Sequence, residues 1–251
     1  MIEYGSLLEG TPFKEQLVSS GFVSQVGETQ KLMVLNSAPE KIIRVGWFAI
    51  QEIGDPTYNY YTENRNVLKR LRDHYGIAVP EFSLVIGAYQ GKPRFYTVSE
   101  RVHGPRLSEK VYSPQEVESA RDKLEHFYSG LVRYFRDLYT NGGWYIADLV
   151  EAGNWSGTAQ YVFGKTRGDS DERIYFVDLG PCLEWHARSG DLRPFDFQLP
   201  KLFGMITEIE SKLGSRLQNA RENFSEFLDS MSERHKSLDS VRDLKRKVDS
   251  R

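Results

Sequence analysis

The sequence predicts an α+β fold, with an antiparallel β-rich amino-terminal part and a mainly helical carboxy-terminal part. Short apolar runs separated by turn residues fill roughly the first hundred residues, a pattern typical of antiparallel strands. Long stretches with apolar residues at helical spacing follow, over 113–139, 196–213 and 215–231. Strands grouped ahead of helices, rather than alternating with them, favour the α+β class.

Composition bounds the size and the class of the protein. The 251 residues suffice for one large domain or for two lobes that share a cleft. The formal net charge of -2 provides no overall basic field, so we expect no nucleic-acid partner. We interpret the single cysteine, Cys182, as a packed thiol, which suits a reducing compartment. Because no signal peptide or membrane span is recognisable, we expect a cytoplasmic protein.

Three strands are expected in the first fifty residues, over Phe22–Val26, Lys31–Leu35 and Lys41–Val45. The third strand carries the basic residue Arg44 in its interior. Lys41 stands at the start of the same strand, and its odd spacing from Arg44 places the two side chains on opposite faces.

A helix is predicted from Thr62 to Tyr75, with Glu63 in its first turn and Gly76 at its end. Glu63 either complements the helix dipole or pairs with a basic residue of the sheet. Two further strands, Phe82–Ala88 and Phe95–Ser99, are joined by a turn-forming segment and predict a hairpin.

Two apolar runs near the middle of the chain each end in an aspartate. Asp148 follows the long helix, which ends at Asn141, and Asp178 follows the run Ile174–Val177 and begins the triplet D-L-G. Asn154 lies six residues after the first aspartate. Carboxylate and amide oxygens are the ligands that hard divalent cations prefer, so these side chains are candidates for a metal site.

The order of these motifs resembles the protein-kinase-like superfamily, and within it the small bacterial phosphotransferases related to aminoglycoside kinases. The resemblance rests on the aspartate–asparagine spacing, the later D-L-G, the G-I-A-V-P after the first helix and the E-x-x-x-G-x-x-L after the second hairpin. It implies that Asp148 accepts the proton of a substrate hydroxyl. It also implies that Asn154 and Asp178 hold Mg²⁺ on the phosphates of ATP.

The same resemblance implies a two-lobed fold, with an amino-terminal lobe over 1–102 and a helical lobe over 103–251. Arg44 takes the place of the family lysine that pairs with phosphates, and Glu63 takes the place of its glutamate partner. Glu100 to Val102 would form the hinge whose backbone contacts the adenine. The partners implied are a nucleotide and an unidentified small-molecule or protein acceptor.

Three functional hypotheses follow from these residues. The first is an active ATP- and Mg-dependent phosphotransferase that acts on a hydroxyl, although the segment ending A-P-E that positions protein substrates is missing after the D-L-G. The second is a catalytically weak or inactive kinase-like regulator that binds a nucleotide or a protein. Arg44 favours it, because a bulky guanidinium does not simply replace a lysine ammonium. The third assigns Asp148 and Asp178 to helix caps or turns.

Overall fold

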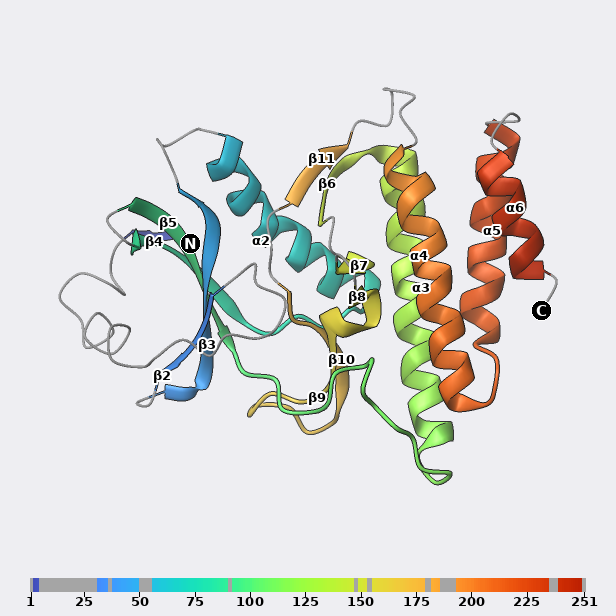
Figure 1. Ribbon diagram of the computed structural model, residues 1–251, viewed down its shortest axis with the longest axis horizontal. Coiled ribbons are helices and arrows are strands. Elements are labelled where there is room, and N and C mark those ends of the chain that lie inside the picture. Colours follow the sequence, from blue (N-terminus) through green and yellow to red (C-terminus); the bar gives the residue numbers. More distant parts are fainter. Residues whose placement is uncertain are drawn as a thin grey trace.

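The computed structural model describes residues 2–4, 31–35, 38–49, 56–89, 92–146, 149–152, 155–178, 182–185, 193–234 and 239–249. The predicted strand Phe22–Val26 and its flanking glycines lie outside these residues. Figure 1 shows a β-sheet on one side of the molecule, a group of long helices on the other, and helix α2 between them. The predicted α+β class, with a β-rich lobe followed by a helical lobe, is confirmed.

The described sheet of the amino-terminal part has five strands. They are β1 (Ile2–Tyr4), β2 (Lys31–Leu35), β3 (Ala38–Ala49), β4 (Phe82–Tyr89) and β5 (Lys92–Glu100). Their order is β1-β4-β5-β3-β2, in which β1 runs parallel to β4 and all other pairs are antiparallel. The predicted hairpin corresponds to β4 and β5, and β2 and β3 form a second antiparallel pair. Strand β3 is longer than predicted and has a register shift against β5 between Val45 and Ala49.

Helix α2 (Pro56–Tyr75) connects β3 to β4 and lies beside the sheet. It buries an apolar stripe and ends at Gly76, whose φ of 70° is accessible to glycine with little strain. The predicted start at Thr62 was wrong. Pro56 begins the helix instead, as proline often does, because a residue in the first turn needs no backbone N–H and proline has none. Glu63 therefore lies well inside α2 rather than in its first turn.

The segment after β5 packs closely against a later strand, β9 (Tyr161–Gly164). The His103 N–H donates to the Lys165 carbonyl at 2.9 Å, and the Leu107 N–H donates to the Tyr161 carbonyl at 2.8 Å. A Cβ atom on Gly104 would lie 2.2 Å from the Phe163 carbonyl oxygen, so only glycine permits this approach. Because Gly104 has no side chain, the segment that follows β5 can pack closely against β9.

Helix α3 (Val117–Asn141) forms the centre of the helical part. It buries the predicted stripe of Leu124, Phe127, Leu131, Phe135 and Leu138. Ser113 and Pro114 suit an N-cap and a first helical residue, but the first helical residue is Val117, because Ser113 and Glu116 close a separate turn through a hydrogen bond between their side chains at 2.7 Å. Its end at Gly142, with a φ of 71°, agrees with the prediction.

Short strands connect α3 to the remaining helices. Strand β6 (Gly143–Ile146) pairs with β11 (Cys182–Trp185), β7 (Glu151–Ala152) pairs with β8 (Trp155–Ser156), and β9 pairs with β10 (Arg173–Phe176). A 3₁₀ turn, η2 (Gly157–Gln160), lies between β8 and β9. The polar segment Gly164–Asp171 predicts the turn of a hairpin, and it lies in the connection between the antiparallel strands β9 and β10.

The chain continues through α4 (Arg193–Leu213), α5 (Gln218–Arg234) and α6 (Asp239–Asp249). The many charges of the last stretch, from Val241 to Arg251, predict a frayed, solvated end, and this prediction was wrong, because Val241, Leu244 and Val248 of α6 are buried. These residues form one stripe of an otherwise charged helix. None of the helices in the described ranges is long and apolar enough to cross a membrane.

Candidate nucleotide and metal site

Arg44 is a buried cation in the middle of the sheet, with only 8% of its surface exposed. Its Nη1 donates to Oγ of Ser99, on the neighbouring strand β5, at 3.2 Å. Burial lowers the pKa of Arg44, whereas the negative charge of Asp178 raises it. Lys41, in contrast, forms an exposed ion pair with Glu100 at 3.8 Å, in agreement with its predicted place on the opposite face.

Asp178 lies just beyond β10, at the point where the chain leaves that strand. Two backbone hydrogen bonds fix this exit. The Phe176 N–H donates to the Ala78 carbonyl at 2.9 Å, and the Val177 N–H donates to the Gln160 carbonyl at 3.1 Å. The partly buried Asp178 carboxylate is thereby held within electrostatic range of Arg44. Two residues that the sequence separates widely thus come together, one from each part of the fold.

Glu63 is half-buried on α2 and accepts a hydrogen bond from Asn66 Nδ2 at 3.0 Å. Arg44 and Glu63 are both described, and they do not form the ion pair that the family resemblance implies. The negative charge of Glu63 instead acts on Cys182 in β11. Burial first, and then this charge, raises the pKa of the Cys182 thiol to about 12. Cys182 is fully buried, as expected for a packed thiol.

The backbone of the predicted hinge is held by hydrogen bonds before Val102 and, through the His103 N–H that donates to Lys165, after it. The Glu100 N–H donates to the Glu81 carbonyl at 2.9 Å, and the Arg101 N–H donates to the Glu40 carbonyl at 2.8 Å. The Val102 N–H has no acceptor among the described residues. It is therefore a backbone donor that a planar ligand beside β5 could use.

Asp148 and Asn154 lie outside the described residues, but the segments beside them are well anchored. Ile146, Leu149 and Val150 are fully buried, and the Tyr161 hydroxyl donates to the Leu149 carbonyl at 2.6 Å. Of the predicted catalytic and metal-binding residues, the structure therefore places Asp178 alone. Within the described ranges, no group of three or more His, Cys, Asp or Glu side chains could hold a metal ion.

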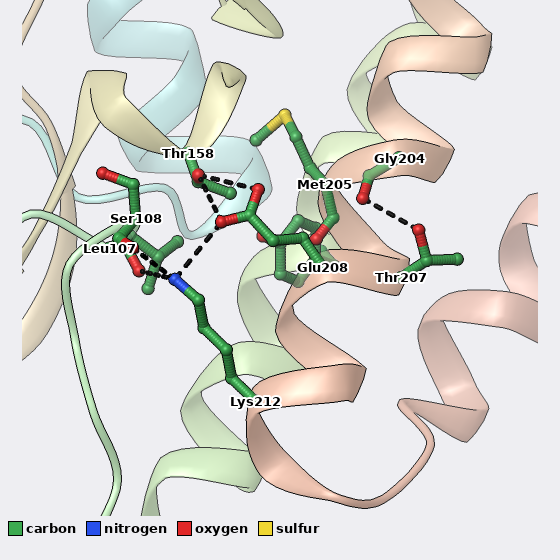
Figure 2. Close-up of polar contacts among 9 residues, drawn as sticks. Leu107, Ser108, Thr158, Gly204, Met205, Thr207, Glu208 and Lys212 are labelled. Atoms are coloured by element: carbon green, nitrogen blue, oxygen red, sulfur yellow. Dashed lines mark hydrogen bonds and ion pairs between the residues drawn. The ribbon is translucent and has the colours of Figure 1, made fainter. Parts of the chain in front are cut away.

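A polar cluster that the sequence analysis missed holds η2 against α4 (Figure 2). The fully buried Thr158 hydroxyl donates to both carboxylate oxygens of Glu208 at 3.1 Å. Lys212, one turn further along α4, forms an ion pair with Glu208 at 3.2 Å and donates to the carbonyls of Leu107 and Ser108. The i,i+4 spacing of Glu208 and Lys212 was the available signal.

This cluster fixes the chain shortly after the predicted metal ligand Asn154. Gly157 begins η2 and lies so close to Val150 that an added Cβ atom would be 2.4 Å from its carbonyl oxygen. The two segments that flank Asn154 are therefore held together by close backbone contact and held to α4 by the Thr158–Glu208 hydrogen bonds.

No model of a known protein family matches the chain, and no curated protein matches it. Three solved structures resemble it over most of its length, all at low sequence identity.

The first of these is a microcompartment-associated aminopropanol kinase, with 12% identity, a TM-score of 0.43, and 92% of this chain and 89% of that chain covered. A pseudokinase in its apo form has 12% identity and a TM-score of 0.39, with 95% and 96% covered. The Helicobacter pylori proinflammatory kinase CtkA has 10% identity and a TM-score of 0.32, with 92% and 90% covered. These three solved structures are thus two kinases and a pseudokinase.

Proposed function

We propose that this chain is a kinase-like phosphotransferase that transfers the γ-phosphoryl group of ATP to a hydroxyl acceptor. The approach of Asp178 to Arg44 is the observation that carries the proposal. It brings a carboxylate suited to a metal within electrostatic range of a phosphate-binding type of cation, one from each part of the fold.

The unpartnered Val102 N–H supports a nucleotide on the same side of the fold. A donor at the hinge, flanked by two fixed peptide groups, suits the edge of a planar base. Arg44 would then contact the phosphates, while Glu63 would hold α2 in place beside the cleft. The boundary of the two lobes near residue 102, which this arrangement needs, remains part of the proposal.

The Asp178 carboxylate fits a hard divalent cation, and Asn154 would supply an amide oxygen of the same kind. Magnesium, when bound to these residues, would neutralise the charge that develops on the phosphate oxygens. Asp148 would orient the acceptor hydroxyl and take up its proton. The bond from the γ-phosphorus to the β-phosphate oxygen breaks, the bond to the acceptor oxygen forms, and ADP leaves.

The acceptor is proposed to be a small molecule rather than a protein side chain. No A-P-E follows Asp178, the place where protein kinases carry the segment that positions peptides, and the A-P-E at residues 38–40 belongs to β3. ADP release in the presence of a panel of amino alcohols, sugars and a generic protein substrate would test this choice. The Asp148→Asn variant is the matched control, because it keeps the shape of the side chain but cannot accept the proton.

A second candidate function is a nucleotide-binding regulator without catalysis, and Arg44 favours it. The positive charge of the Arg44 guanidinium already offsets part of the negative charge of Asp178, so this carboxylate depends less on a metal ion for neutralisation. Nucleotide binding that requires no magnesium, together with no ADP release for any acceptor, would support this candidate over the phosphotransferase.

A further inference from the structure

A positively charged hollow lies between α2 and α3, away from the candidate nucleotide site. It has a volume of about 620 Å³. Helix α2 contributes Arg70, His74 and Tyr75, and the second half of α3 contributes most of the opposite wall, including Arg133 and Arg136. None of the described candidate site residues, which are Arg44, Glu63, Glu100, Val102 and Asp178, lines it. We propose that this hollow binds a small phosphorylated ligand.

The charge of the hollow is opposite to that of the whole chain. Its lining includes three arginines and one aspartate, whereas the chain has a formal net charge of -2. The aspartate, Asp137, already accepts a hydrogen bond from the Tyr75 hydroxyl at 2.8 Å. A concentration of cations in a concave surface attracts anions, because the protein walls focus the field.

The arginines retain donors for a ligand. Arg133 makes no ion pair with any described residue, and Arg136 has only a long, exposed contact with Glu226 at 3.8 Å. Arg70 donates through Nη2 to the Trp144 carbonyl at 2.9 Å, but its buried Nε has no partner among the described residues. The three arginines outnumber the one carboxylate in the lining and repel one another, and a bound anion would reduce that repulsion.

The side chain that comes from α2 is held in position before any ligand binds. The Arg70 guanidinium lies over the ring of Tyr134, 5.6 Å from its centroid, and Tyr134 packs edge-on against Tyr75 at 5.3 Å. Burial raises the pKa of Tyr134, and the nearby Arg70 charge opposes that rise. An arginine fixed by a backbone carbonyl and an aromatic face loses little freedom when it binds an anion.

The arrangement suits a phosphoryl group better than a single carboxylate. Arg70 approaches from α2, while Arg133 and Arg136 lie three residues apart on α3 and project from one side of it. A phosphoryl group offers three terminal oxygens in different directions, and arginine recognises such groups with paired donors. The volume also lies within the range of roughly 300–1,000 Å³ that is usual for small-molecule sites, so it leaves room for an organic part.

The test is a calorimetric titration of the full chain with inorganic pyrophosphate in magnesium-free buffer. We expect one binding site whose affinity falls as salt is raised. The double variant R133Q/R136Q should bind at least about tenfold more weakly, since each lost charge-assisted hydrogen bond is worth a factor of roughly ten. Both substitutions are at exposed or half-exposed positions, so the fold should be retained, and circular dichroism checks this.

The matched control is Arg65→Gln, which removes an exposed arginine of α2 that does not line the hollow. Its pyrophosphate affinity should stay within about twofold of the wild type, as general screening of a surface charge predicts. No binding at millimolar pyrophosphate, or equal losses in R133Q/R136Q and Arg65→Gln, would overturn the site. Tighter binding of citrate than of pyrophosphate would overturn the assignment to a phosphoryl group.

Discussion

The Asp178 carboxylate stabilises the charged form of the buried Arg44 guanidinium, although the two residues belong to different lobes of the fold. Strand β3 fixes one of them, and the backbone bonds at the exit of β10 fix the other. The pair therefore reports on how the lobes are held relative to each other, as well as on the charge of the candidate site.

The Arg44–Asp178 relationship predicts a measurable coupling in folding stability. In a double-mutant cycle with Arg44→Met and Asp178→Asn, either single change leaves the other group without its counter-charge. We expect a coupling free energy of more than about 0.5 kcal/mol from urea unfolding, because the two charges interact electrostatically. If the two losses add to within about 0.5 kcal/mol, this electrostatic interaction is absent.

The cluster at η2 predicts a local loss of stability when the Thr158 hydroxyl is removed. Thr158→Val keeps the volume but takes away the donor to Glu208, so unfolding should become easier by about 1–2 kcal/mol. Hydrogen exchange of the amides in η2 should accelerate. Thr207→Val on the exposed side of α4 is the matched control, and a loss as large as that of Thr158→Val would contradict the assignment.

A buried ion pair joins the last three helices and predicts a larger effect. Arg221 Nη2 lies 2.5 Å from a Glu210 carboxylate oxygen, both side chains are about nine-tenths buried, and Arg221 Nη1 donates to the Val248 carbonyl of α6 at 3.1 Å. Glu210→Gln should therefore cost about 3 kcal/mol in free energy of unfolding, because it leaves a buried guanidinium uncompensated.

The control for Glu210→Gln is Asp243→Asn, which breaks an exposed ion pair with Arg246 on α6. Exposed pairs contribute little, so this change should cost less than about 1 kcal/mol. Equal losses in the two variants would show that the Glu210–Arg221 pair is not buried in solution.

The pKa of Cys182 is raised to about 12, against an ordinary value of 9.0. This shift predicts the reactivity of the thiol and a pH dependence of the folding stability. At neutral pH the folded thiol should react with a thiol reagent only as fast as the protein unfolds. Because the folded state favours the neutral thiol, its contribution to stability is complete below about pH 9 and declines as the pH rises toward 12. Cys182→Ala should lack this decline, and an identical alkaline profile would contradict the prediction.

The elements that the sequence predicted best were those with strong periodicity. The stripe of α3 and the hairpin of β4 and β5 follow from local spacing alone, and both are confirmed. Helix α6 was missed because its three buried apolar residues stand among many charges, so the segment reads as solvated. The beginning of α2 was missed because a proline can either break a helix or begin one.

The candidate site depends on tertiary contacts, so the sequence predicted its residues better than their partners. Two roles were open for Glu63, pairing with Arg44 of the sheet or complementing the helix dipole. In the described structure Arg44 donates a hydrogen bond to Ser99 and interacts electrostatically with Asp178. Glu63 accepts a hydrogen bond from Asn66. Spacing along the chain could not distinguish these arrangements, because the choice depends on the rotation of α2 against the sheet. The roles assigned to Asp148 and Asn154 stay predictions.

Ligand-dependent unfolding tests the central claim, a nucleotide-and-metal cleft between the lobes, most directly. The thermal midpoint of the full chain would be measured with ATP, with Mg²⁺, and with both, for the wild type and for Asp178→Asn. We predict a rise in the midpoint that needs both ligands in the wild type, since binding to the folded state alone stabilises it. The rise should be lost in Asp178→Asn. No shift at millimolar concentrations, or an equal shift in the variant, would contradict the account.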